Sequence, residues 1–129
     1  MNPATTNANT KVAQTASSPP TSHHLMTTDT YLNEIVRVLQ PYDPEKIILF
    51  GSRARGEADA YSDYDLVLIK RTQRSFLERL RDMVPYLVSM TRPVDILVYT
   101  PEEFAQMGET GIGWIVKQEG VILYERLPS

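Results

Sequence analysis

The sequence contains no cysteine among its 129 residues, and its only two histidines, His23 and His24, lie in the N-terminal stretch. The lack of cysteine excludes disulfides, thiolate metal centres and a cysteine nucleophile. The part of the chain that we expect to fold starts later, so it offers no histidine for a Ser-His-Asp triad or a histidine-rich metal site. Catalysis in this chain would therefore depend on carboxylates, hydroxyls, lysines, arginines and bound metal.

Long hydrophobic runs and an excess of basic residues are also missing. No segment approaches the roughly 20 apolar residues that a membrane span requires, and the N-terminus has neither the basic nor the apolar region of a signal peptide. We therefore expect a cytoplasmic protein that does not engage a membrane. Acidic residues outnumber basic ones, 16 to 13. Direct nucleic-acid binding is not expected, because non-specific binding of DNA depends on neutralising its phosphates.

The composition divides the chain into two parts. Residues 1–27 are rich in Thr, Ala, Asn, Ser and Pro, with hardly any large apolar side chain, so they cannot bury enough surface to offset the entropy lost on ordering. We predict a disordered N-terminal tail over residues 1–27 and one domain over residues 28–129, a length that supports a single core. Met26 stands just before the first periodic segment, and the sequence leaves open whether the tail belongs to the functional unit.

Apolar spacing predicts alternating helices and strands after the tail. Strands are expected where short apolar runs are bounded by polar or glycine residues, over residues 46–50, 65–69, 93–99 and 121–124. Helical spacing and capping residues predict helices over residues 29–40, 52–57, 76–88, 100–107 and 111–119, with Pro85 kinking or ending the third. This order indicates the α/β (α+β) class, with a mixed β-sheet covered by helices mainly on one face. Trp114 is expected in the core, and its exposure would instead indicate a partner surface.

Three polar features fall on these predicted strands: Gly51-Ser52 after the first, Asp63 and Asp65 at the start of the second, and Asp95 inside the third. Glycine lets a phosphate approach the backbone, and the serine hydroxyl and the amides of the next helix supply donors. Asp63 and Asp65 point to one face of a strand. We expect Asp95 to be buried, where a lone charge is costly unless a cation compensates it. Two Mg²⁺ ions held by these carboxylates would suit phosphoryl transfer.

Each feature alone also fits an ordinary turn or a solvated strand end, but together they resemble a known family. Gly51-Ser-Arg-Ala-Arg-Gly56, Ser62-Asp-Tyr-Asp-Leu66 and Asp95 resemble the G-S-x-A-R-G, S-D-x-D-L and D motifs of minimal nucleotidyltransferase (MNT) domains. These domains belong to the DNA polymerase beta-like nucleotidyltransferase superfamily. The resemblance covers residues 51–95 directly, and the order of the predicted elements extends it over the domain. It implies the nucleotidyltransferase fold.

The resemblance also implies roles for individual residues. Gly51 and Ser52 would hold the nucleotide phosphates, joined by Arg55, which occupies the motif arginine. Asp63 and Asp65 would bind two Mg²⁺ ions, with ATP as the substrate. Asp95 would complete the catalytic metal site and help to activate the acceptor hydroxyl. Arg53 is left open, as an ordinary surface charge or as a phosphate ligand suited to bidentate contact.

The family suggests a biological setting. Many MNT proteins are antitoxins encoded beside HEPN-domain ribonucleases, and some transfer AMP from ATP to a tyrosine of that toxin. About 100 folded residues leave no room for an acceptor-holding domain, so we expect a partner protein, such as a HEPN-domain toxin, or a homo-oligomer to complete the site. The resemblance thus implies a protein adenylyltransferase that acts as an antitoxin. The alternatives are transfer to a small molecule such as an aminoglycoside, and an antitoxin that acts by binding alone.

Overall fold

A mixed five-stranded sheet organises the protein. The computed structural model describes residues 22–24 and 29–127, and the strands lie in the order β2-β6-β3-β4-β5. Strands β4 and β5 are parallel, and all other neighbours are antiparallel. This confirms the predicted class and the mixed sheet. The strands are β2 (Ser22–His24), β3 (Lys46–Phe50), β4 (Tyr64–Ile69), β5 (Val94–Tyr99) and β6 (Val121–Arg126).

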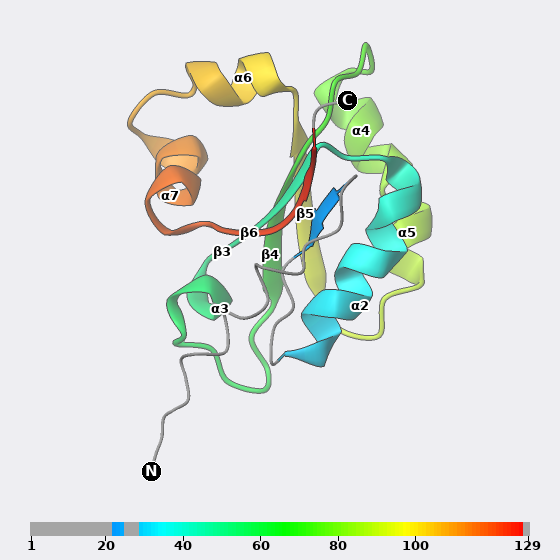
Figure 1. The fold of residues 1–129 in the computed structure, drawn as a ribbon, viewed down its shortest axis with the longest axis vertical. Coiled ribbons are helices and arrows are strands. Elements are labelled where there is room, and N and C mark those ends of the chain that lie inside the picture. Colours follow the sequence, from blue (N-terminus) through cyan, green and yellow to red (C-terminus); the bar gives the residue numbers. More distant parts are fainter. Residues whose placement is uncertain (1–21, 25–28, 128–129) are drawn as a thin grey trace.

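Helices cover the sheet on both faces, with the larger layer on one of them. Helices α2, α4 and α5 lie on one side of the sheet, α6 and α7 lie on the other, and α3 lies at one end (Figure 1). The helical elements are α2 (Thr30–Leu39), the short 3₁₀ helix η1 (Gln40–Tyr42), α3 (Ser52–Arg55), α4 (Phe76–Asp82), α5 (Val84–Val88), α6 (Pro101–Gln106) and α7 (Gly111–Glu119).

The alternation of side chains along the central strand explains the two layers. In β4, Tyr64, Leu66 and Leu68 point into the larger core, where they meet the apolar stripe of α2. Val67 and Ile69 point to the opposite face and pack into a smaller cluster with α6 and α7. A strand that is buried on both faces is continuously apolar, which is why this run could be recognised in the sequence. Asp65 is the one charged residue in it.

Local signals set several helix boundaries as predicted. Asp29 caps α2 by accepting a hydrogen bond from the Tyr31 amide, and a capping box at Thr100 opens α6. The long periodic segment is divided at Met83 into α4 and α5, and Pro85 lies in the first turn of α5. Proline removes a donor from a helix interior and is tolerated in the first turn, so the break confirms the expected effect of Pro85.

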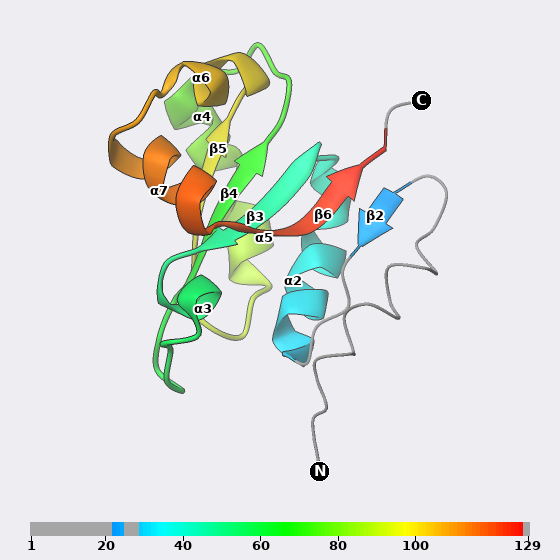
Figure 2. The ribbon, with the colours of Figure 1, turned by 60° about the vertical axis from the view of Figure 1, so that its left-hand side comes forward.

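Two features depart from the sequence predictions. Ser22–His24 forms the edge strand β2 against β6, inside the segment predicted to be disordered (Figure 2). Edge pairing uses backbone groups of β6 and needs no apolar side chains, so composition gave no sign of it. The rest of the predicted tail lies outside the described residues. Trp114 is 43% exposed rather than part of the core. Among the helices that the structure describes, none is long and apolar enough to cross a membrane.

Arg79 connects α4 to α6, which lies on the other face of the sheet, by reaching across the edge strand β5. Its guanidinium is buried, donates to the carbonyl of Val98 at 3.0 Å, and forms a two-bond pair with Glu103 at 2.8 and 3.0 Å. The pair lowers the pKa of Glu103, mainly through the Arg79 hydrogen bonds. Arg79 of α4 therefore binds both the Val98 carbonyl of β5 and Glu103, which belongs to the capping box of α6.

Replacing this side chain tests its contribution to stability. Arg79→Met should lower the free energy of unfolding by about 2–3 kcal/mol, because the Val98 carbonyl and Glu103 lose their donors. Urea denaturation followed by circular dichroism measures the change. Arg81→Met, at an exposed position of the same helix, should change stability by less than about 0.5 kcal/mol. Equal effects of the two substitutions would contradict a structural role for the buried arginine.

Candidate functional site

The register of three strands builds the site at one end of the sheet. Phe50, the last residue of β3, lies opposite Asp65 of β4, and Asp65 in turn lies opposite Asp95 of β5. Because β3 runs antiparallel to β4 while β4 and β5 run parallel, the end of β3 meets the beginnings of both other strands. The turn that follows β3 therefore lies beside the two carboxylates.

Alternation along the strands places the carboxylates on one face. Asp65 and Asp95 share the face of the sheet that carries α6 and α7, because their neighbours two positions on, Val67 and Leu97, pack into that layer. Asp63 precedes β4 by one residue and stands two positions from Asp65, which gives it the same orientation. Asp65 is partly buried, and Asp63 and Asp95 are exposed. The expectation that Asp95 is buried was therefore wrong.

Electrostatics link the three carboxylates. The pKa of Asp65 is raised above its ordinary value, first by partial burial and then by the negative charges of Asp95 and Asp63. The cost of ionising this site therefore comes first from the partial burial of Asp65 and then from the two neighbouring negative charges. Among the residues described, no lysine or arginine forms an ion pair with any of the three.

The donor set fits a divalent cation. Oxygen ligands from carboxylates are the ones that Mg²⁺ prefers, and a bound cation would relieve the repulsion that raises the pKa of Asp65. In the described part of the chain, however, no three acidic or histidine side chains are already gathered tightly enough to form a metal cluster. Asp63, Asp65 and Asp95 are candidate ligands because they share one face at one end of the sheet.

Gly51 brings the backbone against these carboxylates. Its φ of 79° lies in the left-handed region, and a Cβ at this position would stand 2.5 Å from Oδ2 of Asp65. Ser52 follows as the first residue of α3 and is partly exposed. An anion bound at this turn would thus lie next to Asp65, the arrangement that a metal-bound phosphate requires.

Sequence reasoning missed Glu119, the last residue of α7. Its carboxylate accepts a hydrogen bond from the Gly51 amide at 2.9 Å and pairs with the Arg55 guanidinium at 3.1 Å. Arg55 also pairs with Glu57 at 2.8 Å. Two groups expected to hold phosphate are therefore bound to a carboxylate. No sequence spacing pointed to Glu119, because its position follows from the pairing of β6 with β3.

A glycine-serine turn beside strand carboxylates, on a mixed sheet with helices on both faces, is the arrangement of a nucleotidyltransferase. Residues 33–128 match the family model described as "Polymerase beta, Nucleotidyltransferase". The chain belongs to this family. A comparison with curated protein sequences finds no match.

Solved structures with a similar fold include toxin–antitoxin complexes. A toxin–antitoxin structure with AMP-PNP matches with a TM-score of 0.55 and 20% identity, over 73% of each chain. The MntA-HepT toxin–antitoxin matches with a TM-score of 0.52 and 17% identity, over 76% of this chain and 73% of that one. A chain of a structure named as a minimal nucleotidyltransferase matches with a TM-score of 0.50 and 23% identity, over 71% of this chain and 88% of that one. At these identities the similarity concerns the fold.

The close approach of Gly51 to Asp65 can be tested with a pair of glycines. Gly51→Ala should lower the melting temperature more than Gly56→Ala, because the Cβ at position 51 meets Asp65 and the backbone there, with ψ of −160°, suits glycine alone, whereas Gly56 has ψ of 19° and open space around its Cβ. Differential scanning fluorimetry gives both values. Equal losses of stability would show that the contact with Asp65 and the special backbone conformation of Gly51 are both unimportant to the fold.

The raised pKa of Asp65 makes a prediction with a definite sign. When the pKa of a carboxyl is higher in the folded state than in the unfolded state, its ionisation lowers the free energy of unfolding. The loss develops as the pH rises from the unfolded to the folded pKa. Asp65→Asn should therefore raise the melting temperature at pH 7 and leave it unchanged near pH 3, where the carboxyl is protonated in both states.

Asp59, in the loop before β4, provides a control whose pKa is shifted in the opposite direction. Hydrogen bonds from Tyr61 and Ser62 lower the pKa of Asp59, so its ionised form stabilises the folded state above the unfolded pKa. Asp59→Ala should consequently lower the melting temperature at pH 7, with a smaller effect near pH 3. A lower melting temperature for Asp65→Asn at pH 7 would contradict the repulsion described above.

Proposed function

We propose that the protein is a Mg²⁺-dependent adenylyltransferase that moves AMP from ATP to a hydroxyl group of a partner protein and thereby acts as an antitoxin. The partner would be a HEPN-domain toxin and the acceptor a tyrosine. The observation that carries this proposal is the strand register that sets Asp65 opposite Asp95 and beside Gly51, in a chain of the nucleotidyltransferase family.

The geometry suggests how the residues divide the work. The Gly51 amide and the Ser52 hydroxyl would donate hydrogen bonds to the phosphates of ATP. Asp63 and Asp65 would hold Mg²⁺, which when bound offsets the phosphate charge and orients the reacting oxygens. Asp95 is exposed next to Asp65 and would accept the proton of the acceptor hydroxyl. The hydroxyl oxygen then bonds to the α-phosphorus, and pyrophosphate leaves with the bridging oxygen.

The fold supports a protein as the source of the acceptor. The family match covers residues 33–128, so nearly all the described residues form the transferase module itself. Toxin–antitoxin complexes, one of them with AMP-PNP, are among the structures with the same fold. Trp114 is 43% exposed on α7, and an exposed tryptophan is typical of partner surfaces. Transfer to a small molecule and inhibition by binding alone remain as the competing functions.

An intact-mass experiment tests the proposal. The protein is mixed with a candidate HEPN-domain partner, ATP and Mg²⁺, and the partner should gain the mass of one AMP. Asp95→Asn should abolish the adduct yet retain binding of Mg²⁺-ATP, because Asp63 and Asp65 keep their carboxylates. Asp43→Asn provides the control, since Asp43 lies beyond the opposite end of β3 and pairs with Arg126.

The competing functions predict different results. Rescue of growth from the toxin without any adduct, by both the native protein and Asp95→Asn, would indicate an antitoxin that acts by binding. An adduct found on an aminoglycoside and not on the partner would indicate a small-molecule transferase. Loss of activity in Asp43→Asn would show that the assay responds to surface charge rather than to the site.

A further inference from the structure

Arg53 contacts the loop that leads into β4 through Nε and Nη2, and its Nη1 lies 3.9 Å from Oδ2 of Asp29. Its side chain is 13% exposed. Nε and Nη2 donate to the carbonyl of Ser62 at 3.1 and 2.9 Å, and Nη2 also donates to the carbonyl of Asp59 at 3.1 Å. Three hydrogen bonds to backbone oxygens thus connect α3 with the loop. Arg53 is therefore not the ordinary surface charge that the sequence allowed, because its side chain is mostly buried and bonded to the backbone.

The same guanidinium also covers the residue on the other side of Asp63. The Arg53 Cζ lies 3.9 Å from the centre of the Tyr64 ring, a distance typical of a cation–π contact. Tyr64 is completely buried, and its hydroxyl donates to Asp29 at 2.9 Å. One side chain therefore holds both the carbonyl before Asp63 and the ring after it.

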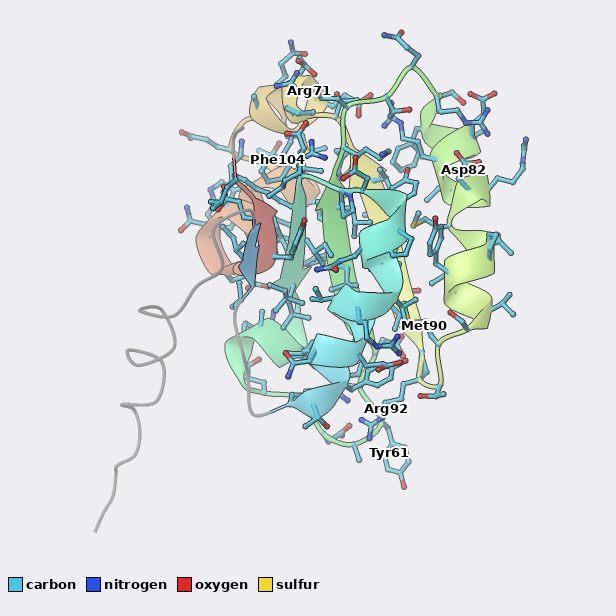
Figure 3. The ribbon with its side chains drawn as sticks, turned by 45° about the vertical axis from the view of Figure 1, so that its right-hand side comes forward. Tyr61, Arg71, Asp82, Met90, Arg92 and Phe104 are labelled. Carbon is cyan, nitrogen blue, oxygen red and sulfur yellow. The ribbon has the colours of Figure 1, made fainter. Side chains whose placement is uncertain are left out.

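Asp63 is held through its two neighbours in sequence: Arg53 binds the Ser62 carbonyl, and the Tyr64 amide donates to the Pro93 carbonyl at 3.1 Å. Asp63 is exposed and stands just before the first paired residue of β4. The preceding loop is solvated, and Tyr61 projects from it away from the body of the molecule with 92% exposure (Figure 3). Hydrogen bonds from Tyr61 and Ser62 to Asp59 close the loop internally, while Arg53 attaches it to α3.

We propose that Arg53 is a positioning residue that fixes the backbone at Asp63, so that this carboxylate meets the metal together with Asp65. The inference rests on the proposed function, because it assumes that Asp63 is a metal ligand. A planar guanidinium with donors at fixed angles can hold two carbonyls and stack on a ring at once, whereas lysine offers a single point charge. Arg53 would therefore act through Asp63 without touching the nucleotide.

The test measures how much Mg²⁺ the protein needs to bind ATP. Binding of a fluorescent ATP analogue is titrated with Mg²⁺ for the native protein, Arg53→Lys and Arg53→Gln, below the melting temperature of each. Residues that orient metal ligands typically change metal affinity by 10- to 100-fold. The Mg²⁺ concentration at half-saturation should rise about tenfold in both variants, and binding should recover at high Mg²⁺.

A neighbouring arginine supplies the matched control. Arg92 lies at the same end of the molecule as Tyr61 (Figure 3). It donates to the Tyr64 hydroxyl at 3.4 Å and lies over the Tyr31 ring. Its hydrogen bonds do not include the carbonyls of Asp59 and Ser62. Arg92→Gln should therefore retain the native Mg²⁺ requirement, whatever it does to stability.

A second variant keeps the test decisive if the Arg53 variants do not fold. Asp59→Ala loosens the same loop at an exposed position and should raise the Mg²⁺ requirement in the same direction, by a smaller factor. A native Mg²⁺ requirement in the folded Arg53 variants, or in Asp59→Ala where they do not fold, would overturn the positioning role. ATP binding by the native protein that is independent of Mg²⁺ would instead overturn the proposed function itself.

Discussion

The register of β4 between its two neighbours is the constraint on which the rest of the structure depends. Antiparallel pairing with β3 and parallel pairing with β5 bring Phe50, Asp65 and Asp95 into one row across the sheet. A shift of one residue would turn Asp65 toward the larger core and expose Leu66. Moving an ionised carboxylate into the apolar core is costly, so the core that stabilises the fold also determines where the carboxylates lie.

Strand β4 contributes both a charged residue to the site and apolar residues to the core. Partial burial and the like charges of Asp95 and Asp63 raise the pKa of Asp65, which interrupts an otherwise apolar run. The apolar residues that follow it, Leu66–Ile69, are buried without exception. The burial of these residues stabilises the fold enough to offset the repulsion between Asp65 and Asp95 at the beginnings of β4 and β5. Side chains at this end of the strands reach solvent. The three aspartates accordingly lie together at one end of the sheet, while Lys46 and Glu125 pair at the other end.

Most elements could be predicted because they rest on local signals. Helical spacing gave α2, the break beside Pro85 followed from proline chemistry, and short apolar runs gave the central strands. The glycine-serine turn and the aspartates could be identified because their spacing is distinctive. Glu119 and the contacts of Arg53 could not, since both depend on residues brought together by strand pairing. Burial at Asp95 and Trp114 was misjudged because apolar neighbours in sequence do not reveal which face is covered.

The Gly51 amide already donates a hydrogen bond to Glu119, so an anion that binds at this turn must replace the Glu119 carboxylate. An incoming phosphate that takes this donor and Arg55 must displace a carboxylate already bound to both. The end of α7 is fixed by the Gly120 amide, which donates to the Val116 carbonyl at 2.8 Å, and by the packing of Val116 in the smaller cluster. Glu119 would therefore leave by rotating its side chain. Affinity at the turn is then a difference between two competing anions.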